Sequence, residues 1–244
     1  MKASTRCLKN NHCLKRDFNI EYTNMINLSQ VRKNPQILEF IKQGESALGA
    51  LGYPEHGIKH VGLVADRART IAREIGLQKK DQELAAIAGF CHDIGSFLSR
   101  KSHHYFGAFL FQEVFSKDFS PREMAQIMQA IVSHDESEME FSNPISAVVV
   151  LADKSDVRRS RVLTKKMAEI KSEIHDRVNY ATQRSRLKID KVKKKITLTL
   201  KIDTKFVPIM EYFEIFTQRM VYCRKAAKFL GYHFGLVINN FKLL

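Results

Sequence analysis

Apolar residues recur at intervals of three and four over much of the chain before residue 135, a spacing that fits α-helices rather than strands. The clearest case lies in residues 55–75, where the apolar positions are Val61, Val64, Ala65, Ala68, Ile71, Ala72 and Ile75. Gly76 follows directly, and glycine commonly ends helices. The pattern predicts an amphipathic helix at this place, and with it a mainly α fold.

Similar spacing predicts further helices over residues 37–44, 80–92, 103–115 and 121–132. The last of these has a clear start, because Ser120 precedes Pro at the first helical position and Glu at the third. The apolar segment 145–151 contains three consecutive valines and suits a strand as well as a helix. A long charged helix is expected over residues 155–181.

The period of the pattern changes in the last quarter of the chain. Apolar and polar residues alternate over 196–202, which predicts a strand, and residues 187–190 could pair with it as a hairpin. A helix over 208–230 and a strand over 234–238 complete a β-β-α-β unit. The sequence therefore predicts a basic leader (1–28), a helical domain (29–165), and a helix plus small α+β domain (166–244).

Composition limits where the protein acts and what it binds. The 244 residues include 40 basic and 26 acidic ones, a formal charge of +14, which would attract polyanions or else only solvate the surface. The four cysteines show no disulfide-scaffold spacing, and Cys7, His12 and Cys13 lack a second ligand pair nearby. No apolar run approaches the ~20 residues of a membrane span, so a cytoplasmic location is expected.

Several histidines lie where predicted helices begin or end. Six of the nine fall within residues 56–134. His92 and Asp93 stand at the C-terminal end of one predicted helix, His60 lies near the start of the preceding one, and Asp153 follows the apolar segment. Imidazole nitrogen and carboxylate oxygen together suit a divalent cation. We therefore expect these four side chains to converge on one ion.

These residues resemble the motifs of the HD superfamily of metal-dependent phosphohydrolases. The resemblance covers about residues 55–161 through the segments His60-Val-Gly-Leu-Val-Ala65, His92-Asp93-Ile-Gly95 and Leu151-Ala-Asp153. It implies an HD-domain helical bundle that hydrolyses a phosphate mono- or diester. It also implies that a divalent metal, whether Mn, Fe, Co, Ni, Zn or Mg, is held by His60, His92, Asp93 and Asp153.

Two further segments are similar to family members that hold two or more ions: Ser102-His103-His104-Tyr-Phe-Gly107-Ala108 and Ser133-His134-Asp135-Glu136. The resemblance implies that His103 and His134 bind a second ion and that Asp93 bridges the pair. His104 stays open as a substitute for His103. His56 would lie one turn before His60, either as an extra ligand or as a residue that supports the ligands.

Positive side chains are expected to bind the phosphate. Lys154 and Arg158 are the predicted catalytic cations beside His92 and Asp93. On a helix, Arg158 and Arg161 would both face the site, or they would only solvate the charged helix.

Two carboxylates close in sequence to the expected ligands are expected to have other roles. Asp156 is expected to orient a ligand histidine, and Asp135 to face solvent.

Positions at which the sequence departs from the family motifs narrow the range of expected substrates. Ser96 stands where the cyclic-dinucleotide-cleaving branch usually has lysine, and no Gly-Tyr-Pro element follows His134, so cyclic-di-GMP is not expected. Nucleotides are the substrate class that the resemblance implies. The alternative is an RNA-directed phosphoesterase or an RNA-binding or regulatory HD protein, although residues 191–195 lack interleaved aromatics that would stack bases. A strand edge could pair with a second copy as a homodimer.

Overall fold

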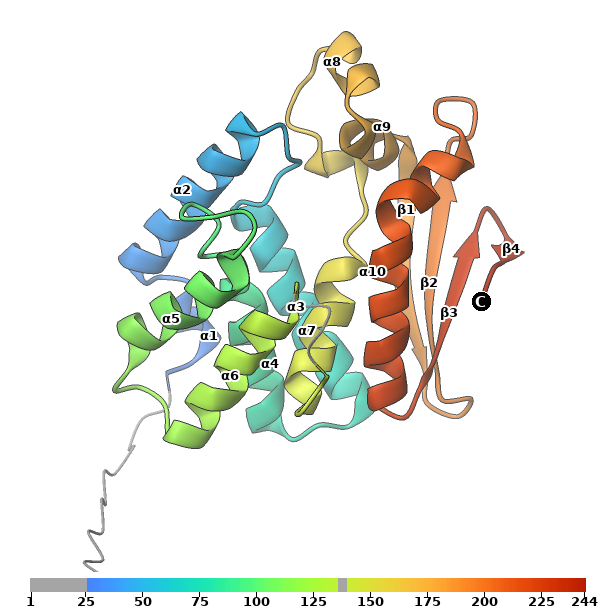
Figure 1. Ribbon diagram of the computed structural model, residues 1–244. Helices are drawn as coiled ribbons and strands as arrows, with labels where there is room; N and C mark the ends of the chain where they lie inside the picture. Colours follow the sequence, from blue (N-terminus) through green and yellow to red (C-terminus); the bar gives the residue numbers. More distant parts are fainter. Residues whose placement is uncertain (1–25, 136–139) are drawn as a thin grey trace, which may run out of the picture.

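The computed structural model describes residues 26–135 and 140–244 and shows a helical body with a small sheet along one side (Figure 1). Most of the predicted leader lies outside the described residues, and so do Cys7, His12 and Cys13. Within the described ranges, no helix is both long and apolar enough to cross a membrane.

The chain up to residue 154 is helical, as the spacing of apolar residues predicts. The helices are α1 (Leu28–Val31), α2 (Pro35–Ala50), α3 (Ile58–Ile75), α4 (Lys79–Cys91), α5 (His103–Phe115), α6 (Pro121–Ser133) and α7 (Pro144–Lys154). The expected start of α6 is present, since the side chains of Ser120 and Glu123 each accept the other's backbone N–H. Gly76 ends α3 with a φ of 90°.

The ambiguous apolar segment forms α7, and its surroundings explain the ambiguity. α7 contacts α3, α4, α6 and α10, and every residue from Ile145 to Lys154 is buried. A helix that is surrounded by protein needs no polar face, so its sequence lacks the period that would separate helix from strand. Asn143 accepts the N–H of Ser146 and thereby fixes where the helix begins.

The prediction of one long helix over residues 155–181 was wrong. The structure has a 3₁₀ turn, η1 (Arg159–Arg161), followed by α8 (Met167–Ser172) and α9 (Ile174–Ala181). Asp156 and Arg161 each make hydrogen bonds to distant residues, at 2.8 Å to His60 and 2.9–3.0 Å to Glu55 respectively. These tertiary contacts outweigh helix propensity in a segment that has no continuous apolar face.

The C-terminal unit is the predicted β-β-α-β arrangement with one addition. Its elements are β1 (Thr182–Asp190), β2 (Lys195–Ile202), α10 (Ile209–Phe229), β3 (His233–Ile238) and a short β4 (Phe241–Lys242). The strand order is β1-β2-β3-β4, with β2 and β3 parallel and the outer pairs antiparallel. The sequence did not predict β4. Asn239 and Asn240, which both have positive φ, form the tight turn before it.

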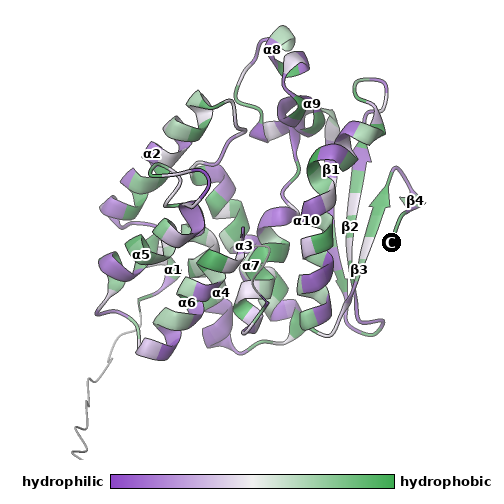
Figure 2. Ribbon diagram, viewed as in Figure 1, coloured by the Kyte–Doolittle hydropathy of each residue, from purple (hydrophilic) through white to green (hydrophobic). Residues whose placement is uncertain are grey.

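α10 lies between the sheet and the helical body (Figure 1). It packs against β3, which is drawn mostly in the hydrophobic colour of Figure 2, and against α7. The Tyr222 hydroxyl donates to the carbonyl oxygen of Ser133 at 2.5 Å, which ties α10 to the end of α6. Residues of both parts share one apolar core. A helix of the C-terminal unit is thereby held next to the ends of α6 and α7.

Candidate metal centre

α3 and α4 approach each other closely enough to bring two histidines together. A Cβ on Gly89 of α4 would lie 3.3 Å from the backbone of Ala65 on α3, so small residues permit the short distance. His60 lies in the first turn of α3, and His92 follows α4 directly. Their Nε2 atoms are 3.3 Å apart, and both side chains are fully buried.

Two aspartates join these histidines. Asp93 Oδ2 lies 3.1 Å from His92 Nε2 and 3.8 Å from His60 Nε2. Asp153, near the end of α7, has its Oδ1 3.3 Å from His60 Nε2 and 3.7 Å from His92 Nε2. Ligands at ~2.0–2.2 Å from a shared ion lie roughly 3–3.6 Å from one another. Each aspartate therefore lies near both histidines, and His60, His92 and Asp93 form one group of donors that could hold a cation.

The loop after Asp93 contacts the start of α5 through two glycines. A Cβ on Gly95 would lie 2.2 Å from the carbonyl oxygen of His103 and 2.5 Å from the amide nitrogen of Gly107. A Cβ on Gly107 would lie 3.4 Å from the carbonyl oxygen of His92. Larger residues would push α5 away from the loop, so both glycines help to place His103 beside Asp93.

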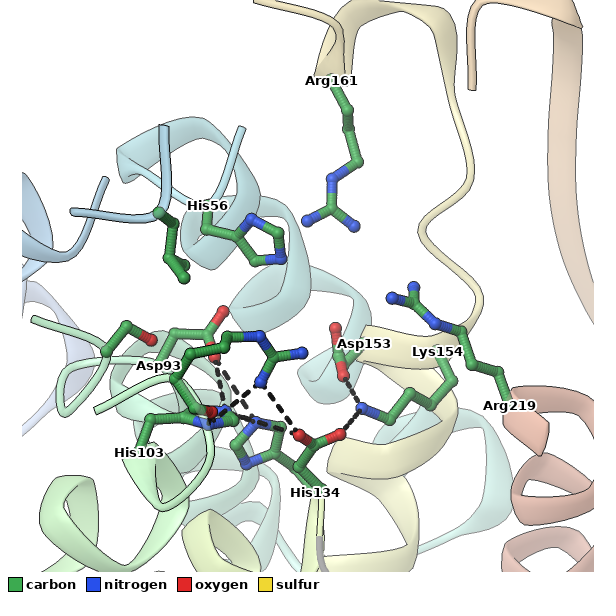
Figure 3. A pocket seen from close by; sticks show the side chains of 12 residues that line it. His56, Asp93, His103, His134, Asp153, Lys154, Arg161 and Arg219 are labelled. Carbon is green, nitrogen blue, oxygen red and sulfur yellow. Dashed lines mark hydrogen bonds and ion pairs between the residues drawn. The ribbon is translucent and has the colours of Figure 1, made fainter. Parts of the chain in front are cut away.

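A second group of donors forms around the other oxygen of Asp93. Asp93 Oδ1 lies 3.2 Å from His103 Nε2 and 3.4 Å from His134 Nε2. The two Nε2 atoms are 3.0 Å apart. Figure 3 shows these three side chains meeting at one end of the pocket. Because Oδ2 faces His92, Asp93 links two groups that could each hold an ion.

The Nδ1 atoms of these four histidines all have partners within the protein. His60 Nδ1 lies 2.8 Å from Asp156 Oδ2, as predicted, and the other three each lie 2.6–2.8 Å from a carbonyl oxygen three residues earlier. A carbonyl can only accept, so Nδ1 donates and the lone pair is left on Nε2. Facing Nε2 lone pairs 3.0–3.3 Å apart repel unless a cation or proton lies between them. The donors therefore fit a divalent ion.

Charges in the site keep the aspartates ionised. Burial raises the pKa of Asp93 and Asp153, but nearby positive groups and hydrogen bonds outweigh burial and hold both values well below the usual range. Burial lowers the pKa of His92, yet Asp93 and Asp153 raise it to about 9. For His134 burial dominates and lowers the pKa to about 4. An ion that binds His92 must therefore displace a proton.

His56 and His104 lie beside these groups. His56 precedes α3, and its ring packs edge-on against that of His60 with 5.5 Å between centroids. In the described part of the chain, the donor groups that could share an ion do not include His56, although it lines the pocket. His104 forms such a group with His103 and Asp135. The histidine of this pair that lies next to Asp93 and His134 is His103, not His104.

The expectation that Asp135 faces solvent was wrong. Asp135 lines the pocket, where its Oδ1 lies 3.0 Å from Lys154 Nζ and its Oδ2 lies 3.2 Å from Arg100 Nη1. Lys154 is buried and also contacts Asp153 Oδ2 at 2.9 Å. A buried ammonium needs a counter-charge, which Asp135 supplies together with Asp153.

Arg158 and Arg161 do not share one helical face, because their segment is a loop with a 3₁₀ turn. The Arg158 guanidinium contacts Asp156 Oδ1 at 2.9 Å and Glu55 Oε2 at 3.2 Å, and Arg158 is not among the residues that line the pocket. Arg161 does line it, held by two hydrogen bonds to the carbonyl oxygen of Glu55. Of the two alternatives left open for these arginines, facing the site describes Arg161, whereas Arg158 lies outside the lining of the pocket.

Sequence reasoning missed two further cations of the pocket, Arg100 and Arg219. Arg100 stands just before the His103 motif, and Arg219 comes from α10 (Figure 3). Neither residue belongs to a recognisable motif. The contact of α10 with α7, which carries Arg219 to the site, leaves no trace in residue spacing.

The helical bundle and the paired histidine–aspartate groups define a fold of the HD type. Residues 57–159 match the model of the HD domain family, and this segment is an HD domain. The chain is also similar to the Uncharacterized protein MJ1020 of Methanocaldococcus jannaschii, at 27% identity over 154 residues. The match covers 53% of this chain and 58% of that protein, so the chain spans less than two thirds of this relative.

Proposed function

We propose that this protein is a metal-dependent phosphohydrolase that cleaves a phosphate mono- or diester, with nucleotides as the substrate class. The position of Asp93 carries the proposal, since its Oδ2 lies 3.1 Å from His92 Nε2 and its Oδ1 3.2 Å from His103 Nε2. One carboxylate that faces two donor groups suits two ions about 3.5–4 Å apart, a spacing used to clamp a phosphoryl group.

The ligands divide between two ions. The first would be held by His60, His92, Asp93 and Asp153, and the second by His103, His134 and Asp93. Mixed nitrogen and carboxylate donors suit Mn, Fe, Co, Ni or Zn better than Mg, which prefers oxygen. Bound ions would supply a water of lowered pKa and neutralise phosphate charge.

Other side chains hold the ligands in place. Lys154 Nζ lies 2.9 Å from Asp153 Oδ2, which leaves Oδ1 facing the histidines, and Asp156 fixes the ring of His60. Lys154 is therefore proposed as a positioning residue that also offsets the charge of the aspartates. A catalytic role for Arg158 is not part of the proposal, because its guanidinium is engaged by Asp156 and Glu55.

The pocket favours a small anionic substrate. The space within its lining is small, with a cavity volume of about 20 Å³, so only a small group could enter it. Arginine and lysine side chains line it above the donor groups. These features support a phosphoester, and nucleotides as the class come from the resemblance of the motifs.

Metal analysis followed by a hydrolysis screen tests the proposal. Purified protein should contain up to two transition-metal ions per chain and should release phosphate or a nucleotide product from one of a panel of mononucleotides, cyclic nucleotides and simple phosphoesters. Asp93→Ala should lower both metal content and turnover to background. Asp66→Ala is the matched control, because Asp66 is an exposed aspartate on α3. Equal activity of wild type and Asp93→Ala would contradict the proposal.

One observation favours the RNA-directed alternative. Arg184 lies directly opposite Lys201 across β1 and β2, and Arg186 and Lys188 follow at alternate positions on the same face. Within the described ranges, none of the four makes an ion pair. Like charges opposite each other cost stability, and an uncompensated row of cations attracts a polyanion.

Salt-dependent RNA binding separates this alternative from a nucleotide phosphohydrolase. Binding to a generic single-stranded RNA should weaken steeply with salt, and the double variant Arg186→Gln/Lys188→Gln should reduce the slope of log K against log salt by about 1.5. Two exposed lysines away from the sheet, Lys42 and Lys117, are the matched control when both are changed to glutamine. The RNA-directed alternative fails if the protein shows no affinity at physiological salt.

A further inference from the structure

Four cations line the pocket: Arg100, Lys154, Arg161 and Arg219. The first three have protein partners. Lys154 and Arg100 pair with aspartates, and Arg161 donates to carbonyl oxygens at 2.9–3.2 Å. Arg219 differs, because among the described residues its guanidinium makes no hydrogen bond and no ion pair.

The position of Arg219 is nevertheless defined. It extends from α10 toward the pocket, where its guanidinium faces the same space as the Asp153 carboxylate and the Arg161 guanidinium (Figure 3). The ring of Phe216, one turn earlier on α10, lies 5.0 Å from the Arg219 Cζ atom. Arginine stays protonated in proteins, and a half-buried charge without partners is costly. Such a group is suited to an anionic ligand that supplies the missing acceptors.

A second unpaired group lies in the same pocket. Ser96 is only 5% exposed, and its buried hydroxyl has no hydrogen-bond partner in the part of the chain that the structure describes. A buried hydroxyl normally finds a partner, so this one also calls for a ligand or a water. Ser96, in the loop after Asp93, and Arg219, on α10, both line this pocket and provide donors for an anion that carries more than one acceptor oxygen.

We propose that Arg219 binds the non-bridging oxygens of the phosphoryl group, so that α10 completes a site begun by the HD domain. The planar fork of arginine fits two phosphate oxygens at once. Arg219 lies outside residues 57–159, the segment that matches the family model. Identifying the anion as part of a substrate rests on the proposed function, whereas the anion site itself does not.

Binding of inorganic phosphate to the metal-loaded, full-length protein tests the site without turnover. Arg219→Gln should weaken phosphate binding about 10-fold to 100-fold, the range for losing a charged hydrogen bond, with metal content unchanged. Arg219→Lys keeps the charge without the fork and should lie between wild type and Arg219→Gln. The control is Arg224→Gln, which removes the same charge from an exposed position of α10 and should leave phosphate affinity unchanged.

Kinetics separate this inference from the proposed function. If the protein hydrolyses a phosphoester, Arg219→Gln should raise KM or lower kcat/KM at least tenfold while Arg224→Gln does not. If no phosphoester is hydrolysed but phosphate binding still depends on Arg219, the proposed function fails and the anion site stands. Phosphate affinity that is equal in wild type and Arg219→Gln, or absent in the wild type, would overturn the inference.

Discussion

His60 Nδ1 lies 2.8 Å from Asp156 Oδ2, and both side chains are shielded from solvent. The other carboxylate oxygen of Asp156 accepts from Arg158 Nε at 2.9 Å, so the carboxylate is fixed from both sides. This pair joins the start of α3 to the segment after α7. A carboxylate in this place orients the imidazole and makes its Nε2 a stronger ligand.

Changing Asp156 to Asn should weaken metal binding about 10-fold to 100-fold, because the amide keeps the shape but loses the charge that supports His60. Metal affinity is measured by competition with a chelator. Asp66→Asn, at an exposed position of α3, serves as the control. Unchanged affinity in Asp156→Asn would show that His60 is not a ligand that depends on this contact.

Gly95→Ala should displace His103 and reduce the metal content, since the new Cβ would lie 2.2 Å from the His103 carbonyl oxygen. We also expect a loss of about 1–3 kcal/mol in the free energy of unfolding, as for other overpacked sites. Gly62→Ala is the control, because a Cβ there meets nothing within 4 Å and lies on α3, where alanine favours the helix. Denaturant unfolding measures the change in the free energy of unfolding of both variants, and metal analysis measures their metal content.

Metal affinity should fall as the pH falls from 9 toward 6. Asp93 and Asp153 outweigh burial and raise the pKa of His92 to about 9, so the metal-free protein carries a proton that the ion must displace. Below that pKa each unit of pH weakens apparent affinity about tenfold per proton released. His134, with a pKa of about 4, adds no such dependence in this range. Calorimetry in buffers of different ionisation enthalpy counts the protons, and a count of zero at pH 7 would contradict this prediction.

Glu123 should stabilise the protein only above acidic pH. Burial raises the pKa of its carboxyl, but hydrogen bonds from Lys80 and Ser120 outweigh burial and lower it. A carboxyl whose pKa is lower in the folded state stabilises the fold above its unfolded pKa of ~4.3, and the effect is lost as pH falls through the folded value. Glu123→Gln should therefore cost about 1 kcal/mol at pH 7 and progressively less below pH 4.

Thermal unfolding of Glu123→Gln at several pH values measures this difference. Glu113→Gln, at an exposed position of α5, should show no comparable loss at any pH. A difference between wild type and Glu123→Gln that stays constant from pH 7 to pH 3 would rule out the carboxylate as its source.

Local patterns in the sequence predicted most of the helices. Apolar spacing identifies α3 and α6, and Gly76 and Ser120 mark ends that the structure shows at the same places. The structures of α7 and of residues 155–181 were harder to predict from the sequence. α7 is surrounded by protein and has no polar face, while the segment after it is shaped by contacts of Asp156 and Arg161 with residues far away in the chain.

The sequence alone determined the two donor groups, because their histidines and aspartates stand at helix ends that the chain specifies locally and that carry family motifs. The sequence also indicated Lys154 and Arg161, but tertiary structure alone brought Arg100, Arg219 and Asp135 to the pocket. Asp135 turns inward because Lys154 is buried beside it, and Arg219 reaches the pocket because α10 packs on α7. Both follow from contacts between segments distant in sequence, which residue spacing does not encode.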